Sequence, residues 1–479
     1  MKNVTDLLFF CGMDDALLFV DKESSITYKE ARSKVLSIAC HLHEMKIENQ
    51  AILVQVGRDY DTLLLFLGIA FSNNCYVPVS PDTPKERLED IIRIGDITYG
   101  FDSPFLKGNL DSKEALSSSI SQEDVKEMEE GHSLDNPLYL MFTSGSTGKP
   151  KGVKKSHGNV LSFVEDFRKT FPFIPENLKL CNQTPFYFDA SAKDIYLTMA
   201  LKSTLYIPCK ETFALPNKSV EYLSDNHIDM IMWVPSALIM IARIRVLKFM
   251  KPQSLKYVFF IGEVFPPKYF NMWYEALPHV RYFNWYGSTE IAGACLYHEI
   301  TSPLKEDEPM KTGKPLYGNE VKLEDGEICV SSPQVALGYI KDEERNRSTF
   351  RLEDGKIFLH TGDYAEYDRD GDIVFRSRKD FQIKHMGYRI ELQDIETSVN
   401  SLSDIDSCCC LYDSKKDRIV LFATLNDEKS IGDILNECKK ILPSYMMPGK
   451  VILLKSMPLN ANGKIDRVKL KETMENQNV

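Results

Sequence analysis

A short apolar run that leads directly into a turn rich in glycine, hydroxyl groups and lysine constrains this chain more than any other segment. Residues 139–153 read YLMFTSGSTGKPKGV, with the apolar run at 139–142 and the turn at 143–149. Glycine permits positive φ angles, and every residue of the turn offers a backbone N–H. Such a turn can wrap its donors around phosphate oxygens, which predicts a nucleoside triphosphate site in an energy-coupled enzyme. The predicted phosphate-binding residues are Thr143, Ser144, Gly145, Ser146, Thr147, Gly148 and Lys149.

The turn could also be a Walker A loop or an ordinary surface loop. The Walker A pattern, G-x-x-x-x-G-K-[ST], requires glycine where the chain has Thr143 and a hydroxyl residue where it has Pro150. The chain therefore departs from that pattern at both ends. Clusters of glycine, serine, threonine and lysine also form ordinary surface loops, so the run alone leaves that alternative open.

The bulk composition fits a globular protein with more than one domain. A chain of 479 residues is too long for one ordinary core, because domains commonly have roughly 100–200 residues. Hydrophobic residues make up 43% and charged residues 27%, which is typical of a soluble fold. The net charge of −11 offers no basic footprint for nucleic acid and does not favour binding to anionic membranes.

The sequence gives no sign of export or membrane insertion. The first residues lack the long apolar core of a signal peptide and are interrupted by Asp6, Asp14 and Asp15. The most apolar internal stretch, residues 228–247, contains Pro235 and charged residues, which argues against a membrane span. Eleven cysteines without C-x-x-C pairs indicate reduced thiols. We therefore expect a soluble cytoplasmic protein.

The first 300 residues alternate short apolar runs with amphipathic ones. Strands that are apolar throughout are typical of parallel sheets covered on both faces by helices. We predict an α/β fold with a large N-terminal domain of parallel-rich sheets covered by helices, a small β subdomain, and a small mobile α+β C-terminal domain. The predicted strands are 51–56, 76–79, 204–208, 229–234 and 257–261, and the predicted helices are 61–71, 194–201, 218–226 and one that begins at 236.

The sequence pattern changes after Arg378. The rest of the chain predicts a compact α+β domain of about 100 residues, the size of an independent folding unit. We therefore predict an N-terminal core of residues 1–379 and a C-terminal domain of residues 380–479. In the second domain the predicted helices are 389–402 and 430–442, and the predicted strands are 406–411, 418–425 and 451–454. Along a strand the consecutive Cys408, Cys409 and Cys410 cannot all face one way to bind a metal.

Together with the turn, five further segments resemble the adenylate-forming superfamily, which includes acyl-CoA synthetases, luciferases and the adenylation domains of peptide synthetases. The segments occur in the family's order. They read NWYGSTE at 284–290, TGD at 361–363, RSRKDFQIKHMGYRIEL at 376–392, LPSYMMP at 442–448 and NGKIDR at 462–467. The resemblance implies that ATP and a carboxylic acid react to give an acyl-adenylate, which a thiol then attacks.

The segment 284–290 implies a site for adenine and magnesium. In the family, the residues matching Asn284 and Tyr286 hold and stack on adenine, the residue matching Thr289 contacts phosphate, and the residue matching Glu290 binds Mg²⁺. A carboxylate is a hard oxygen ligand of the kind that Mg²⁺ takes. Taken alone, the segment could equally be an ordinary strand-end turn. The resemblance places Gly262, Glu263, Trp285, Gly287 and Ser288 in the same nucleotide site.

Two later motifs imply the ribose site and a hinge. Asp363 of TGD can accept hydrogen bonds from both ribose hydroxyls, and Arg378 matches a residue that contacts ribose or phosphate. Asp380 matches the pivot of the family's mobile domain, and Gly387 matches a glycine that lines the approach of the thiol. Ser377 stands where the family commonly has glycine, which restricts the backbone there.

Lys464 is the residue we expect to be catalytic. Attack of a carboxylate on the α-phosphate brings two anions together, and an ammonium that bridges them offsets the repulsion. In the family this lysine contacts both ATP and the acid. The alternative is an exposed turn lysine, because N-G-K is a common turn sequence.

Asp189 indicates which class of acid is activated. It lies in FYFDASAKDIY at 186–196, where amino-acid-activating members carry an aspartate that binds the substrate's α-ammonium. A buried carboxylate requires a cationic partner, and a substrate ammonium can be that partner. The alternative is a helix N-cap, for which aspartate is also well suited.

Lys193 matches a position in the substrate pocket of peptide-synthetase domains. A lysine there could pair with an acidic substrate side chain, but it could equally pair with Asp189 or Asp194 or point to solvent. The bulk of Trp285 predicts a small cavity and hence a small substrate. The other positions that match the pocket are Met232, Phe259, Ile261, Gly293 and Ala294.

The layout resembles stand-alone D-alanine:carrier-protein ligases most. Ile261-Gly262-Glu263-Val264 resembles a phrase of theirs, although Ile261 stands where they commonly have cysteine, so the amino acid stays open. We expect the thiol acceptor to be a separate phosphopantetheinyl carrier protein. The alternatives are an acyl- or aryl-CoA ligase of the same superfamily and a nucleotide-binding module without catalysis.

Overall fold

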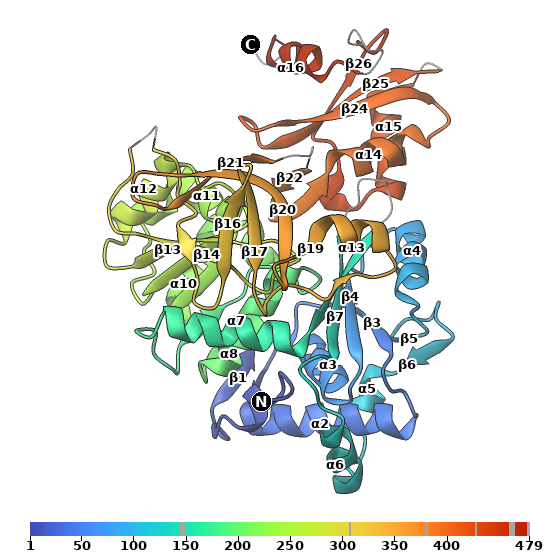
Figure 1. Cartoon of the computed structure of the whole chain (residues 1–479), viewed down its shortest axis with the longest axis vertical. Helices are drawn as coiled ribbons and strands as arrows, with labels where there is room; N and C mark the ends of the chain where they lie inside the picture. Colours follow the sequence, from blue (N-terminus) through green and yellow to red (C-terminus); the bar gives the residue numbers. More distant parts are fainter. Residues whose placement is uncertain (144–149, 306–307, 379–381, 427–428, 459–464, 477–479) are drawn as a thin grey trace. The chain divides into compact units, whose positions relative to one another are not determined.

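The computed structural model describes the chain except residues 144–149, 306–307, 379–381, 427–428, 459–464 and 477–479 (Figure 1). The chain forms two compact units. The first comprises Met1–Pro81, Ile94–Met141 and Gly152–Lys379, and the second comprises Asp82–Arg93, Phe142–Lys151 and Asp380–Val479.

A nine-stranded sheet is the largest element of the first unit. The strands β9 to β13 pair in parallel, as the continuous apolar runs predicted, and β13 pairs antiparallel with β14. The strand order is β15-β14-β13-β12-β11-β9-β10-β1-β2. Their bounds are β1 Leu17–Val20, β2 Ser25–Thr27, β9 Lys179–Cys181, β10 Thr204–Tyr206, β11 Met230–Trp233, β12 Tyr257–Ile261, β13 Arg281–Tyr286, β14 Leu296–Ile300 and β15 Lys314–Pro315.

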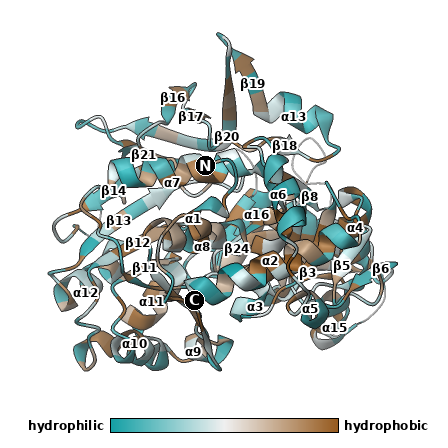
Figure 2. Ribbon diagram, turned by 90° about the horizontal axis from the view of Figure 1, so that it is seen from below, coloured by the Kyte–Doolittle hydropathy of each residue, from teal (hydrophilic) through white to brown (hydrophobic). Residues whose placement is uncertain are grey.

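Both faces of this sheet are buried under helices. Met230 and Met232 of β11 belong to one hydrophobic core, which includes Phe167 of α7 (His157–Thr170) and Ile195 of α8 (Ala192–Ala200). The intervening Ile231 and Trp233 belong to a second core with α10 (Pro216–Asp225), α11 (Pro235–Arg243) and α12 (Pro267–Ala276). Successive strand residues point to opposite faces, so two covered faces require apolar residues throughout. In Figure 2 hydrophobic colour gathers on the inner strands.

A seven-stranded sheet holds the run that precedes the glycine-rich turn. Its order is β18-β8-β7-β4-β3-β5-β6, with β3, β4, β5 and β7 joined in parallel pairs. The buried helix α3 (Tyr60–Phe71) follows β3, as its apolar sequence predicted. The bounds are β3 Ala51–Gln55, β4 Cys75–Val79, β5 Tyr99–Phe101, β6 Gly108–Leu110, β7 Pro137–Thr143, β8 Lys151–Ser156 and β18 Gly338–Tyr339.

The predicted small β subdomain is an antiparallel sheet of five strands. Its order is β16-β17-β20-β19, and β21 also pairs with β20. The bounds are β16 Glu320–Glu324, β17 Glu327–Ser331, β19 Phe350–Glu353, β20 Lys356–Tyr367 and β21 Ile373–Arg378.

The second unit contains a three-stranded sheet and a separate hairpin. The sheet consists of β24 (Ile405–Asp413), β25 (Arg418–Leu425) and β26 (Lys450–Leu453), with helix α15 (Ile431–Ile441) after β25. Cys408 and Cys410 pack into one core and Cys409 into another, so they face opposite sides as predicted. The mixed α/β architecture confirms the predicted fold class.

One predicted helix is wrong at its start. Residues 389–391 belong to β23 (Tyr388–Glu391), which pairs with β22 (Gln382–His385), and the helix α14 begins only at Leu392 and ends at Asn400. Met386 and Gly387 both have positive φ angles and form the two-residue turn of this hairpin. Such a turn fixes the strand pairing, and this overrides the helical spacing of the apolar residues.

Among the described residues, none of the helices combines the length and the apolar character that a bilayer span requires. None of the cysteines in the described part of the chain forms a disulfide.

Candidate active site

Two neighbouring parallel strands deliver eight of the predicted nucleotide residues to one sheet edge. Ile261 of β12 lies in register with Trp285 of β13, so the residues that follow both strands emerge together. In open α/β sheets, ligands bind outside the carboxyl ends of the strands. Gly262 has a φ of +104°, and Glu263 accepts a hydrogen bond from the Ser236 N–H at 2.8 Å.

The NWYGSTE and TGD segments meet directly. The Tyr286 hydroxyl donates to Asp363 Oδ2 at 2.5 Å, although the two residues are 77 positions apart. Asp363 on β20 is also the register partner of Arg378 on β21, and the two side chains form an ion pair. Burial and the Asp363 carboxylate raise the pKa of Tyr286 well above its ordinary value, so the hydroxyl remains a donor.

The other predicted residues of this segment are largely enclosed. Asn284 donates to the Lys311 carbonyl at 2.7 Å. A Cβ at Gly287 would lie 2.8 Å from the Gly293 carbonyl oxygen, so the close approach of these two loops requires glycine. The Ser288 hydroxyl is buried without a hydrogen-bond partner among the described residues, and Thr289 is half-buried.

Glu290, the predicted magnesium ligand, is a buried carboxylate with 3% exposure. Its Oε1 accepts a hydrogen bond from the Tyr339 hydroxyl at 2.6 Å. Its backbone is fixed as well, because the Ala336 N–H donates to its carbonyl at 2.8 Å. A carboxylate oriented in this way is the type of oxygen ligand that Mg²⁺ takes.

Asp189, predicted to bind the substrate ammonium, already has a cation beside it. The Lys155 ammonium donates to Asp189 Oδ1 at 2.8 Å and to Oδ2 at 2.9 Å, and it also donates to the Ile291 carbonyl at 2.8 Å. The Tyr139 hydroxyl donates to Oδ1 at 2.8 Å. The Lys155 side chain is 0% exposed, whereas that of Asp189 retains 11% exposure.

Burial opposes the charge on both members of this pair. It raises the pKa of Asp189 above its ordinary value, and it lowers the pKa of Lys155. Their mutual attraction and the hydrogen bonds between them counteract both shifts. Asp189 is the first residue of the short 3-10 helix Asp189–Ser191, whose N-cap is Phe188, so the N-cap alternative is wrong.

Lys193 adopts one of the non-pocket alternatives. Its ammonium donates to Asp194 Oδ1 at 2.9 Å and to the Ala190 carbonyl at 2.8 Å, and its side chain is 1% exposed. Asn182 donates to the other oxygen of Asp194 at 2.7 Å. The lysine thus forms a buried ion pair within α8, and its predicted contact with substrate stays a prediction.

Aromatic rings fill the space around Trp285. Its ring centroid lies 4.5 Å from that of Phe259, and its edge packs against Phe163 and Phe167. A Cβ at Gly293, whose φ is +67°, would lie 2.3 Å from Phe163. Ile261, Met232 and Ala294 are buried in the same hydrophobic core as Phe259 and Trp285.

Two family models match most of the chain. The model of the family described as AMP-binding enzyme matches residues 12–340, and that of the AMP-binding enzyme C-terminal domain matches residues 394–464. The chain belongs to the AMP-binding enzyme family. It is therefore an ATP-dependent, AMP-forming ligase, and the predicted resemblance is confirmed.

The relatives of this AMP-binding enzyme include named ligases and solved adenylation domains. A D-alanine–D-alanyl carrier protein ligase of Staphylococcus epidermidis is 30% identical, with 99% of this chain and 100% of the relative covered. The adenylation domain AlmE of Vibrio cholerae, solved with glycyl-adenosine-5'-phosphate, superposes with a TM-score of 0.83 at 18% identity, over 98% and 97% of the chains. An artificially fused adenylation–PCP di-domain from Klebsiella oxytoca gives 0.81 at 21% identity, over 94% of each chain.

Several predicted residues of this AMP-binding enzyme lie outside the described part of the chain. They are Ser144, Gly145, Ser146, Thr147, Gly148, Lys149, Asp380 and Lys464. Thr143 ends β7, and its Oγ1 is buried without a hydrogen-bond partner among the described residues. Gly387 has a φ of +81° in the β22–β23 turn, so glycine suits this position.

Sequence reasoning missed three residues that hold the predicted carboxylates. Lys155 and Tyr139 contact Asp189, and Tyr339 contacts Glu290. Tyr139 was visible as an apolar strand residue, and Lys155 as one of two adjacent lysines in a strand. A buried lysine within a strand must have a counter-ion, but the sequence did not reveal which carboxylate it would be.

Proposed function

We propose that this enzyme activates a small amino acid with ATP as its aminoacyl-adenylate and transfers the aminoacyl group to the phosphopantetheine thiol of a separate carrier protein. The observation that carries the proposal is the Tyr286–Asp363 hydrogen bond, which joins the two nucleotide motifs. The named ligase relative and the solved adenylation domains support the same reaction class.

The nucleotide would be held by residues on both sides of that hydrogen bond. Tyr286 and Asn284 would bind adenine, Asp363 would accept hydrogen bonds from ribose hydroxyls, and Arg378 would contact ribose or phosphate. Oδ2 of Asp363 accepts a hydrogen bond from Tyr286 and Oδ1 accepts one from Arg378, and a carboxylate oxygen has capacity for more than one. Thr289 and the turn 143–149 would bind the phosphates.

Glu290 fits the magnesium ion that the family implies. Its buried carboxylate is oriented by Tyr339 and offers hard oxygen donors. When bound, the ion neutralises phosphate charge in the transition state. We propose Glu290 as its protein ligand.

Lys464 is our proposed catalytic residue. Its ammonium would contact the substrate carboxylate and the α-phosphate while the carboxylate oxygen forms a bond to phosphorus and pyrophosphate leaves. In the second step the carrier's thiol attacks the acyl carbon, the thioester forms, and AMP leaves with the bonding electrons. We propose that residues 380–479 act as the mobile domain that pivots at Asp380 and brings Gly387 to the thiol's path.

Pyrophosphate exchange tests the first half-reaction. We expect exchange that depends on ATP and on a small amino acid from a panel of proteinogenic amino acids, D-alanine and β-amino acids. Lys464→Ala should nearly abolish exchange while ATP binding survives. Exchange with fatty or aryl acids and none with amino acids would favour the acyl- or aryl-CoA ligase, and no exchange with any acid would favour a module without catalysis.

The Lys155–Asp189 pair favours a second candidate, a small acid that lacks the α-ammonium. Lys155 already supplies the cation that Asp189 needs. The two candidates separate in a panel of acids with the same carbon skeleton: D-alanine, D-lactate and propionate. Exchange with D-alanine alone supports the first candidate, and equal or faster exchange with D-lactate supports the second.

A further inference from the structure

The face of the five-stranded sheet carries a group of side chains that the adenylation reaction does not use. Cys329 on β17 is the register partner of both Lys322 on β16 and His360 on β20. Glu324 and Glu327 lie two residues from Lys322 and Cys329, respectively, so they project from the same face. Directly opposed residues in a sheet bring their Cβ atoms to within about 5 Å, and this places the side chains in contact.

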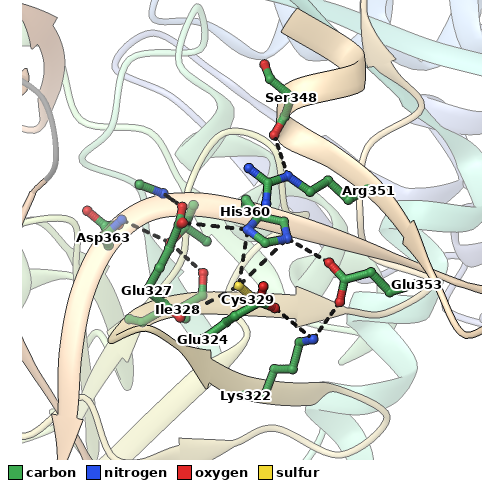
Figure 3. A network of polar contacts seen from close by, with 12 residues as sticks. Lys322, Glu324, Glu327, Ile328, Cys329, Ser348, Arg351, Glu353, His360 and Asp363 are labelled. Carbon is green, nitrogen blue, oxygen red and sulfur yellow. Dashed lines mark hydrogen bonds and ion pairs between the residues drawn. The ribbon is translucent and has the colours of Figure 1, made fainter.

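The side chains of this group converge on one point (Figure 3). Glu324, Cys329 and His360 offer ligand atoms that all lie within 4.8 Å of one another. Cys329 Sγ lies 3.4 Å from His360 Nδ1. Tetrahedral zinc with Zn–S of about 2.3 Å and Zn–N of about 2.0–2.1 Å separates sulfur and nitrogen by roughly 3.5 Å. The observed distance between Cys329 Sγ and His360 Nδ1 therefore fits a shared zinc ion, and it equally fits a direct hydrogen bond between the two groups.

The other nitrogen of His360 is held as in known zinc sites. His360 Nε2 lies 2.9 Å from Glu353 Oε1, so the ring can donate there and leave Nδ1 as a lone-pair donor. Metal-binding histidines commonly donate their second N–H to a carboxylate, which fixes the ring's tautomer and orientation. Glu353 is in turn fixed by the Lys322 ammonium at 2.5 Å.

The charges of the group also favour a cation. Three carboxylates, Glu324, Glu327 and Glu353, surround Cys329 and His360, and Lys322 pairs with Glu324 and Glu353. A metal ion would offset this negative charge and bind the thiolate.

We propose that Glu324, Cys329 and His360 form a structural zinc site in the β subdomain. Thiolate, imidazole and carboxylate are the ligands that zinc takes, and four-coordinate geometry is usual in its structural sites. Glu327 offers the fourth ligand, because its Oε2 lies 3.6 Å from His360 Nδ1. Its Oε1 accepts the Gly362 N–H at 2.8 Å, so the ion would brace the strand that also carries Asp363.

Cobalt substitution of the full-length protein tests the site directly. After treatment with a chelator and dialysis, one equivalent of Co²⁺ should produce the near-ultraviolet charge-transfer absorption of a thiolate–cobalt bond, and one equivalent of Zn²⁺ should abolish it. The band should be absent in Cys329→Ala and retained in Cys438→Ala, which removes another buried cysteine. No band, or a band retained in Cys329→Ala, would overturn the proposal.

Two milder variants keep the test informative if Cys329→Ala does not fold. Glu324 is exposed at the sheet edge, so Glu324→Gln should fold and should bind zinc at least about tenfold more weakly, because a ligand is lost. Glu353→Gln removes no proposed ligand but alters the support of His360 and the ion pair with Lys322, and it should weaken zinc binding by about 10–100-fold. Zinc affinities equal to that of the unmodified protein in both variants would show adventitious binding and refute the site. These measurements use no adenylation activity, so the proposed function can fail without affecting them.

Discussion

Two buried carboxylates, Asp189 and Asp363, are held by the same kinds of partner. They differ in which member of the ion pair, the carboxylate or the cation, is more exposed. Each has a cation and a tyrosine hydroxyl: Lys155 and Tyr139 for Asp189, Arg378 and Tyr286 for Asp363. At Asp189 the cation is sealed, with 0% exposure, and the carboxylate retains 11%. At Asp363 the carboxylate is 1% exposed and the arginine 9%.

The member of each pair that retains more exposure is the one that a ligand can reach more readily. We propose that Asp189 presents its carboxylate to the ammonium of the substrate and that Arg378 presents its guanidinium to the anionic nucleotide. The sealed member acts as the internal counter-ion. This division predicts that removal of the sealed member lowers stability most, whereas removal of the other lowers ligand affinity.

The largest expected effect is on stability, from Lys155→Met. The substitution leaves the Asp189 carboxylate without its cation, and breaking a buried ion pair in this way costs about 3–5 kcal/mol. Urea unfolding of the full chain measures the loss. Lys154→Met, the half-buried neighbour on the same strand, is the matched control and should change stability by less than about 1 kcal/mol.

A double variant shows whether the loss belongs to the pair. Lys155→Met combined with Asp189→Asn removes both charges, so it should recover a large part of the stability that Lys155→Met loses. If the effects of the two substitutions on the free energy of unfolding are additive, Lys155 does not act as the counter-ion of Asp189.

The KM values for the acid and for ATP should distinguish Asp189 from Arg378, the more exposed members of the two pairs. Asp189→Asn should raise KM for the acid by about 10–100-fold and leave KM for ATP nearly unchanged, because a charge-assisted hydrogen bond is worth about 1.5–3 kcal/mol. Arg378→Gln should raise KM for ATP and leave KM for the acid nearly unchanged. Steady-state pyrophosphate exchange with each substrate varied measures both constants, with circular dichroism as the control for folding. If one variant changed KM for the acid and KM for ATP equally, this would contradict the assignment of Asp189 to the acid and Arg378 to ATP.

The sequence predicts the site around Asp363 better than the site around Asp189, and this difference has a physical reason. Asp363 and Arg378 lie 15 residues apart on paired strands, so short motifs locate both. Lys155 reaches Asp189 from β8 of the seven-stranded sheet, and Tyr139 reaches it from β7. Local spacing does not encode such a contact between these strands and the short 3-10 helix that begins at Asp189, and a half-polar strand does not show which of its lysines is buried. The partner of Lys193 stayed open for a different reason: Asp194 is its neighbour in the sequence, but spacing alone does not choose between Asp189, Asp194 and solvent.

The pH dependence of stability should reveal the unpaired carboxylate. Burial already raises the pKa of Asp189, and Lys155→Met removes the charge that opposes this shift. Above the unfolded pKa of about 3.9 the folded variant holds a proton that the unfolded chain has released, so stability falls as pH rises, by up to about 1.4 kcal/mol per pH unit. The fall ends at the folded pKa. Urea unfolding between pH 4 and pH 8 measures this slope. The double variant with Asp189→Asn lacks the group and should not show the additional slope; identical slopes in both variants would assign it to another residue.

The smallest expected effects on stability come from removal of the two tyrosine hydroxyls. These variants test whether a hydroxyl and a cation support Asp189 and Asp363 in the same way. Tyr139→Phe and Tyr286→Phe each remove one donor to a carboxylate that keeps its cation, so each should cost about 1 kcal/mol. Burial raises the pKa of both tyrosines well above the ordinary value, so both hydroxyls remain donors across the neutral range. Equal losses in urea unfolding would mean that hydroxyl and cation share the support of each carboxylate in the same way. A loss confined to Tyr139→Phe would mean that the bidentate contact of Lys155 supports Asp189 less well than the guanidinium of Arg378 supports Asp363.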